Sequence, residues 1–216
     1  MTSSLPTLKL TYFPFRAKGE ASRLALHIGG IPFEDDRVSR QAFVAIKPLQ
    51  PFSQIPVLTI NKTIQIAQSI GIVKYTGILA GLYPTDCLLK AALVDQVILH
   101  MEDMGNLLYD TMSRPDTETV MQERRDIVQV KYPLMFEKLE QVLAQHSGGK
   151  WAVGDSITIA DLSIYVMIAM AKEDMWVGVP GNIGDPFSRI MGVYQAVLEH
   201  PKVVEWEAIP RQLFHH

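Results

Sequence analysis

Two positions in the N-terminal part of the chain place a polar side chain where it can act on a ligand. Ser69 begins a stretch with helical periodicity, and the unpaired N–H groups and dipole of a helix start favour an anion. Tyr12 lies in the alternating segment LKLTYF, and its phenol stays protonated near neutral pH and can donate a hydrogen bond. Each residue also has an ordinary structural interpretation: Ser69 as a helix cap and Tyr12 as a half-buried strand residue.

The only cysteine and the histidines show no pattern typical of nucleophilic or metal chemistry. Cys87 can form no internal disulfide, and no histidine lies nearby in the sequence to lower its thiol pKa, so we expect a buried structural thiol. Three histidines and a terminal pair lack metal-ligand spacing: His27, His100, His146, and His215 with His216. We therefore expect neither a metal site nor a bound cofactor.

Asp161 lies in a helix-start pattern rather than in a catalytic one. Thr158 is placed to cap the N–H of Asp161, and the Asp161 carboxylate is placed to accept from the N–H of Thr158. Ile157 and Leu162 have the spacing of a hydrophobic staple. We expect a capping box at the start of a buried helix.

Strand and helix patterns alternate over residues 1–83. The pattern predicts a strand, a helix, a second strand, a Pro-rich connection, a hairpin and a closing helix: Leu8–Phe13, residues 21–28, Phe33–Val38, Pro56–Ile60 with Thr63–Ala67, and Ser69–Leu79. The order β-α-β-α-β-β-α indicates an α/β domain.

From Pro84 onward the sequence predicts helices alone. We expect long helices over Asp86–Tyr109 and Glu118–Gln145, with Pro133 kinking the second, and further helices from near Thr158 and Pro186. The predicted fold class is therefore α/β plus all-α, with domains at 1–83 and 84–216.

The composition of the chain argues against nucleic acid and membranes as partners. The 216 residues are 48% hydrophobic and 20% charged, with a net charge of −3, so the chain has no basic footprint for nucleic acid. The longest nearly uninterrupted apolar run, Leu162–Ala171, is well short of the roughly 18 residues of a membrane span. With one cysteine and no leader-like N-terminus, a cytoplasmic protein is expected.

Four segments, in order and at suitable spacing, resemble the glutathione transferase superfamily: LTYFPFRAKGEASRLAL, FSQIPVLTI, QSIGIVKY and DSITIADLSIYV. The pair Tyr12–Phe13, with Arg16 and Lys18, is most similar to the sigma-type branch. The resemblance implies a thioredoxin-like domain that binds glutathione, followed by an all-helical domain with an electrophile pocket.

Tyr12 matches the catalytic tyrosine of this superfamily. A free thiol has a pKa near 8.5, and a hydrogen bond from a hydroxyl to its thiolate contributes roughly 1.5–3 kcal/mol, or about 1–2 pKa units. The resemblance therefore implies that Tyr12 raises the thiolate fraction of bound glutathione.

The resemblance also assigns the glutathione contacts. Gln68 and Ser69 would hold the γ-glutamyl carboxylate. Ile55, ahead of a cis bond to Pro56, would pair through its backbone with the cysteinyl unit, and Gln54 lies next to it.

The resemblance implies that Lys47 pairs with the carboxylate at the glycine end of glutathione. The alternative is that Lys47 is a solvated lysine on the face of a helix. Phe43 stands where sigma-type relatives usually have tryptophan, so any contact it makes must be apolar. Lys18 replaces an arginine, which keeps the charge but loses the planar fork.

The residues of the electrophile pocket are suggested only by their location in the sequence, and each of them could equally belong to the hydrophobic core. They are Phe13, Phe15, Lys18, Met104, Tyr109 and Met175–Val177. Asp103 matches an acidic residue that reaches the γ-glutamyl ammonium of the neighbouring subunit's ligand, which implies a homodimer. Glu102 shares this role or, like Asp103 in the ordinary interpretation, belongs to a salt-bridged helix surface.

The resemblance leaves three functions open. The first is conjugation of glutathione to small hydrophobic electrophiles, a detoxification reaction. The second is a glutathione-dependent isomerase of the prostaglandin type, against which Asp110 stands where an aromatic residue is expected. The third is a non-catalytic binding or structural protein on the same scaffold.

Overall fold

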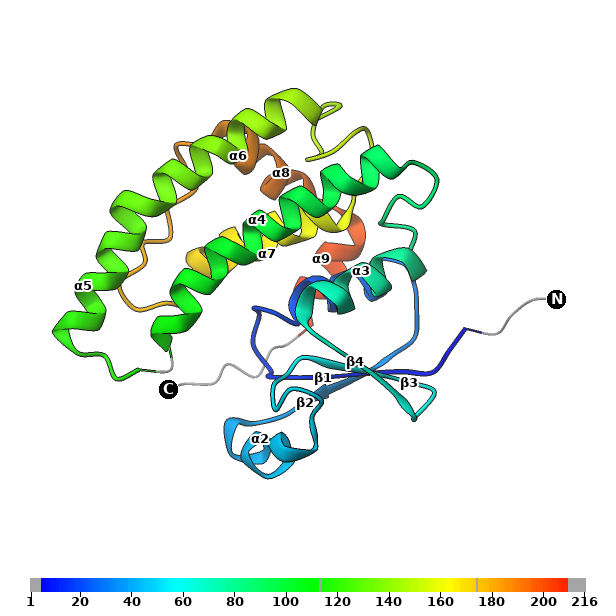
Figure 1. Ribbon diagram of the computed structural model, residues 1–216. Coiled ribbons are helices and arrows are strands. Elements are labelled where there is room, and N and C mark those ends of the chain that lie inside the picture. The colour runs from blue at the N-terminus through cyan, green and yellow to red at the C-terminus, as the bar shows by residue number, and fades with distance from the viewer. Residues whose placement is uncertain (1–4, 113, 174, 210–216) are drawn as a thin grey trace. The chain divides into compact units, whose positions relative to one another are not determined.

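The computed structural model describes residues 5–112, 114–173 and 175–209, which form two compact units. Unit 1 contains residues 5–83 and 200–209, and unit 2 contains the described residues of 84–199 (Figure 1). The terminal pair His215 and His216 lies outside the described residues.

Unit 1 is a four-stranded sheet with helices on both faces. Its elements are β1 (Leu8–Tyr12), α1 (Glu20–Ile28), β2 (Glu34–Arg37), α2 (Arg40–Ile46), the 3-10 turn η1 (Lys47–Leu49), β3 (Val57–Ile60), β4 (Ile64–Ala67), α3 (Ser69–Leu79) and α9 (Pro201–Glu207). The strand order is β2-β1-β3-β4, with β1 parallel to β2 and antiparallel to β3. Figure 1 shows α1 and α3 on one face of the sheet and α2 on the other. Apart from α9, this is the α/β unit that the sequence predicts.

The predicted hairpin is confirmed, and its turn chemistry explains why it forms. β3 and β4 pair antiparallel with Val57 opposite Ala67. Residues 61–63 connect them. Asn61 and Lys62 have φ values of 50° and 64°, two successive positive values as in a type I′ turn, and the N–H of Thr63 bonds to the carbonyl of Ile60 at 3.1 Å. The apolar positions of the sheet then pack on α1 and α3 through the core residues Leu10, Leu26, Leu58 and Ile72.

The expected helical domain 84–216 differs from the structure at its C-terminal end. α9 packs against α1 and belongs to unit 1. Pro201 occupies the first turn of α9, and the side chain of His200 caps it by accepting from the N–H of Lys202. Val203 and Trp206 give the short helix a buried apolar face, which is the reason it docks on α1.

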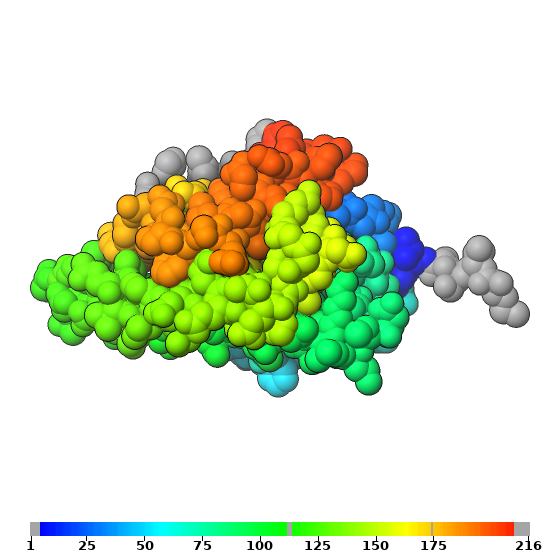
Figure 2. Space-filling view, turned by 90° about the horizontal axis from the view of Figure 1, so that it is seen from above, coloured from blue at the N-terminus to red at the C-terminus, as the bar shows by residue number. Residues whose placement is uncertain are grey.

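Unit 2 is a bundle of helices: α4 (Leu88–Met112), α5 (Glu118–Asp126), α6 (Tyr132–His146), α7 (Ile159–Lys172) and α8 (Ser188–Leu198). α7 is buried along nearly its whole length and packs against α4 and α8. Figure 2 shows the orange surface of α8 directly against the yellow-green surface of α6. Among the described residues, no helix is long and apolar enough to cross a membrane.

Pro133 changes the second long helix more than a simple kink would. Residues Ile127–Lys131 form a π-helical segment (η2) between α5 and α6, in which the N–H of Tyr132 bonds to the carbonyl of Ile127, five residues back. Because Pro133 has no N–H, the regular i to i−4 ladder is interrupted here, and the wider turn takes up the mismatch.

Cys87 is exposed, so the expectation of a buried thiol is wrong. It lies just before α4, and the first residues of that helix, Leu88 and Leu89, are also exposed. The buried face of α4 begins only at Val94. An apolar neighbourhood in sequence is therefore a poor guide to burial at a helix start.

The predicted capping box is confirmed. Asp161 is fully buried and accepts hydrogen bonds from the N–H of Thr158 at 2.7 Å, from its hydroxyl at 2.8 Å, and from the N–H of Ala152 at 2.6 Å. Burial raises the pKa of this carboxyl from its ordinary value of 3.8 to about 6, although the three donors act to lower it.

We expect Asp161→Asn to lower the free energy of unfolding by about 1–3 kcal/mol, because its NH₂ group must face a backbone N–H. The folded state binds the Asp161 proton more tightly than the unfolded chain does. The stabilisation that comes from this tighter proton binding is therefore complete below about pH 4 and is lost as pH rises through about 6. The difference in stability between wild type and variant, measured by urea unfolding, should shrink across that window. Asp155→Asn, at a 91% exposed side chain, is the control, and a difference that widens with pH would contradict this account.

Candidate functional site

Unit 1 contains a pocket of about 300 Å³, formed where four segments meet: the loop after β1, α2 with the start of η1, the segment before β3, and the end of β4 with the start of α3. We call it the unit 1 pocket. Nine of the predicted site residues line it: Phe13, Lys18, Phe43, Lys47, Gln54, Ile55, Pro56, Gln68 and Ser69. The structure therefore brings together residues from four separate segments of the sequence.

Tyr12 ends β1, the strand that lies between β2 and β3, and is buried. Its carbonyl accepts from the N–H of Val38 at 2.9 Å, which fixes its backbone. Its hydroxyl oxygen accepts from the N–H of Lys18 at 3.3 Å. The lining of the pocket includes its neighbours Phe13 and Lys18 rather than Tyr12 itself. An acceptor bond to a backbone N–H makes the phenol a better donor through its own proton.

The segment before β3 supplies the backbone edge of the pocket. The Ile55–Pro56 peptide bond is cis, as the resemblance implies. Because Val57 pairs with Ala67, the pairing of β3 and β4 brings Pro56 to the same end of the hairpin as Gln68. Ser53, with φ of 52°, turns the chain just ahead of this segment.

The first turn of α3 forms the wall next to that edge. Gln68 caps the helix with φ of 72° and no hydrogen bond from its side chain to the first turn. Ser69 is the first helical residue and is buried. The positive φ of Gln68 is a strained conformation for a residue other than glycine, and such strain is concentrated at functional sites. The N-terminus of a helix is suited to an anion.

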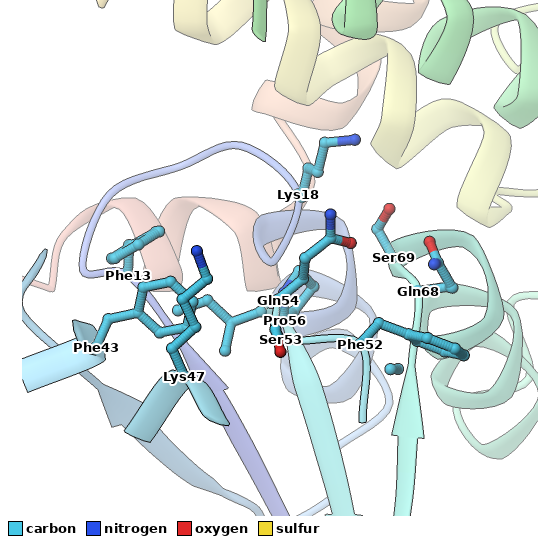
Figure 3. A pocket seen from close by; sticks show the side chains of 12 residues that line it. Phe13, Lys18, Phe43, Lys47, Phe52, Ser53, Gln54, Pro56, Gln68 and Ser69 are labelled. Atoms are coloured by element: carbon cyan, nitrogen blue, oxygen red, sulfur yellow. The ribbon is translucent and has the colours of Figure 1, made fainter. Parts of the chain in front are cut away.

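The charged groups of the unit 1 pocket are cations. Lys18 and Lys47 line it, and its lining contains no carboxylate. Figure 3 shows Lys47 beside the rings of Phe13 and Phe43, with Gln68 and Ser69 on the other side and Gln54 between them. The two rings meet edge to face at 5.5 Å, so the contact of Phe43 within the protein is apolar. The pocket thus offers an anion site at the α3 start and a cation at the opposite side.

The remaining predicted residues lie on α4 in unit 2. Asp103 is exposed and lines a hollow of about 360 Å³ between α4 and α6. The other residues of this hollow are Gln96, Val97, Leu99, His100, Lys138, Leu139 and Val142. Met104 is fully buried, and its carbonyl accepts from the hydroxyl of Tyr132 at 2.9 Å. Its burial does not support the predicted role in an electrophile pocket.

Tyr109 is partly buried against other apolar groups of unit 2. Its ring lies 6.1 Å from that of Trp176, and its hydroxyl contacts the sulfur of Met170 at 3.8 Å. Trp176 is buried, whereas Val177 is 52% exposed. A role for Tyr109 in binding an electrophile stays a prediction.

Comparisons with known proteins identify the family. A model of the "Glutathione S-transferase, C-terminal domain" family matches residues 102–209. Glutathione S-transferase 1 of Ascaris suum is 33% identical over 214 residues, covering 94% of this chain and 97% of that protein. The chain belongs to the glutathione S-transferase superfamily.

Two solved structures place this transferase among relatives with different properties. Prostaglandin synthase D of Nilaparvata lugens is 26% identical, with a TM-score of 0.83 and coverage of 95% of this chain and 99% of that one. A glutathione S-transferase of the hookworm Necator americanus, described as monomeric, is 25% identical, with a TM-score of 0.78 and coverage of 96% and 100%. Family membership therefore specifies neither the reaction nor the assembly.

The sequence analysis did not identify three residues that line the unit 1 pocket, Phe52, Ser53 and Ala67. Ser53 and Ala67 adjoin the predicted residues Gln54 and Gln68, and Phe52 lies two positions before Gln54, so proximity in sequence to these two glutamines was the available signal. Among the described residues, no group of three His, Cys, Asp or Glu side chains is placed to hold a metal ion.

Proposed function

We propose that this transferase conjugates the thiol of glutathione to small hydrophobic electrophiles, with the Tyr12 hydroxyl as hydrogen-bond donor to the thiolate. Glutathione is the co-substrate, and no further cofactor takes part. Detoxification in the cytoplasm is the role that follows.

The observation that carries the proposal is the arrangement of charge in the unit 1 pocket. Glutathione has a carboxylate at each end. The pocket has the helix start at Gln68–Ser69 on one side and Lys47 on the other. In the sequence, Ile55 lies between Lys47 and Gln68–Ser69, and it also lines the pocket. An extended peptide in the pocket can pair with the backbone of Ile55. Lys18, next to the Tyr12 hydroxyl, adds positive charge that favours a thiolate.

A steady-state assay with glutathione and a panel of aryl halides, enones and hydroperoxides tests the proposal. We expect turnover of at least one class, with loss of free thiol matched by product. A protein that binds glutathione but turns over no electrophile would favour the non-catalytic alternative.

A prostaglandin-type isomerase is the second candidate, and the likeness to the Nilaparvata enzyme favours it. Asp110, which is exposed, stands where the resemblance leads us to expect an aromatic residue. Isomerisation regenerates glutathione, whereas conjugation consumes it. Counting the thiol after many turnovers on a prostaglandin endoperoxide therefore separates the two functions.

We also propose that the protein is a homodimer in which Asp103 of one copy meets the γ-glutamyl ammonium bound to the other. The exposure of Asp103 on α4 supports this, because a carboxylate at the surface is available to a second chain. Two-fold dimers are the commonest closed assembly.

Lys47→Gln is expected to raise KM for glutathione about two- to fivefold with little change in kcat. Lys47 is exposed, and exposed ion pairs contribute less than about 1 kcal/mol, acting equally on ground and transition states. The effect should diminish in high salt. Lys62→Gln, in the exposed β3–β4 turn, is the matched control. A fall in kcat at unchanged KM would show that Lys47 acts in the chemical step instead.

A further inference from the structure

The loop between β1 and α1, residues 13–19, adopts a backbone conformation that needs support. Ala17 has φ of 108°, a region that residues with a Cβ rarely occupy. The next residue, Lys18, supplies the N–H that bonds to the Tyr12 hydroxyl and also a side chain of the pocket. A strained residue keeps its conformation only where its surroundings fix it.

A buried group of charged residues lies directly beneath this loop. Arg16, Glu20 and Arg23 are 3%, 2% and 0% exposed. Arg23 donates to the carbonyls of Phe13 at 2.8 Å and Phe15 at 3.2 Å, so it holds the first half of the loop. It also pairs with Glu20 at 3.3 Å. The Tyr12 ring packs close to Gly19, where a Cβ would lie 2.5 Å from the ring.

The helix α9 completes this group from the far end of the chain. Glu207 accepts from both terminal nitrogens of Arg16, with Nη1 to Oε1 at 2.9 Å. The indole N–H of Trp206 donates to Glu20 at 2.9 Å in a buried environment. Figure 1 shows α9 alongside α1, in agreement with their packing. The second half of the loop is therefore held through Arg16, by residues about 190 positions away in sequence.

We propose that α9 is a positioning element for the catalytic loop, in which Glu207 and Trp206 hold Arg16 and Glu20 so that Ala17 keeps its strained conformation and Lys18 stays on the Tyr12 hydroxyl. The inference rests on the proposed function of Tyr12. When the Glu207 charge is removed, the planar bidentate pair with Arg16 is lost. The loop then relaxes toward negative φ at Ala17, and the Lys18 N–H moves off the phenol oxygen.

Glu207→Gln tests the pair with little change of shape. We expect kcat/KM at about pH 6.5 to fall about fivefold, a population shift that corresponds to about 1 kcal/mol. The pKa of the bound glutathione thiol, followed by thiolate absorbance, should rise by about half a unit to one unit. KM for glutathione should change less than kcat. Glu205→Gln is the control, since Glu205 lies on the same helix but pairs with Lys202 at 2.8 Å and lies 3.8 Å from His27.

A second substitution distinguishes positioning from general stability. Ala17→Gly removes the strain, because glycine adopts positive φ readily, and the activity of this single variant is the reference for the double variant. In the double variant with Glu207→Gln it should restore most of the lost activity and the lower thiol pKa. Trp206→Phe keeps an aromatic ring, although a smaller one, and removes the donor to Glu20, so its effect should have the same direction as that of Glu207→Gln.

Two results would overturn the inference. One is a Glu207→Gln protein with wild-type thiol pKa and pH profile, whatever its thermal stability. The other is a double variant no more active than Glu207→Gln alone. If the wild type itself fails to lower the thiol pKa, or if Tyr12→Phe leaves that pKa unchanged, the proposed function fails and the inference fails with it. A failure confined to the α9 variants concerns the inference alone.

Discussion

Tyr12→Phe is expected to lower kcat/KM by roughly 10- to 100-fold at about pH 6.5 while leaving glutathione affinity nearly unchanged. The variant loses one hydrogen bond to a charged partner, which contributes about 1.5–3 kcal/mol, and each 1.36 kcal/mol is about a factor of ten in rate. The deficit should shrink as pH approaches about 8.5, where the thiol ionises without help.

The structure offers a matched control for this change. Tyr75 is a half-buried tyrosine of α3 that packs against the core of unit 1, and Tyr75→Phe removes the same hydroxyl outside the pocket. Its activity should equal that of the wild type. Full activity of Tyr12→Phe at about pH 6.5, or a deficit that does not depend on pH, would remove Tyr12 from the chemical step.

Asp103→Asn is expected to weaken glutathione binding by about 10- to 100-fold if the ion pair is shielded in a dimer, from about 1.5–3 kcal/mol. If the pair stays exposed, the loss is less than about fivefold. Calorimetric titration measures the affinity, and sedimentation gives the assembly state. Glu102→Gln shows whether its neighbour shares the role, and Asp126→Asn, at an exposed residue of α5, serves as the control.

Mixing two defective proteins tests whether the site is shared between chains. A hybrid of Tyr12→Phe and Asp103→Asn subunits contains one site with an intact Tyr12 and an intact Asp103 from the other chain. Activity at low glutathione should therefore rise after subunit exchange. A monomeric protein with full activity, or a mixture that shows only the sum of its components, would place the complete site within one chain.

The sequence predicted most of unit 1, and the start of α7 in unit 2, because the signals there are local. Alternation in LKLTYF, the turn at Asn61–Lys62 and the capping box at Thr158–Asp161 each depend on residues a few positions apart, and all three are confirmed. The nine lining residues were reached through motifs, which keep their spacing even where single residues, such as Phe43, differ from the family pattern.

What the sequence did not reveal depends on contacts between distant segments. α9 has a start signal in His200 and Pro201, but its docking on α1 follows from a tertiary pairing of Trp206 and Glu207 with the loop. Arg16, Glu20 and Arg23 stand at spacings of four and three on one face of α1 and its entry. Three charged residues on the face of α1 that packs into the protein must pair with one another or with other polar groups. Their spacing was therefore the available signal for a buried ion-pair network.

The thiolate fraction of bound glutathione, titrated by ultraviolet absorbance in wild type and in Tyr12→Phe, tests the central claim most directly. The measurement needs no electrophile, so it separates activation of the thiol from the choice of substrate. The wild type should show a thiol pKa about 1–2 units below the free value near 8.5, and the variant should return close to that value. Equal thiol pKa values in the two proteins would contradict the assignment of Tyr12 as the group that activates glutathione.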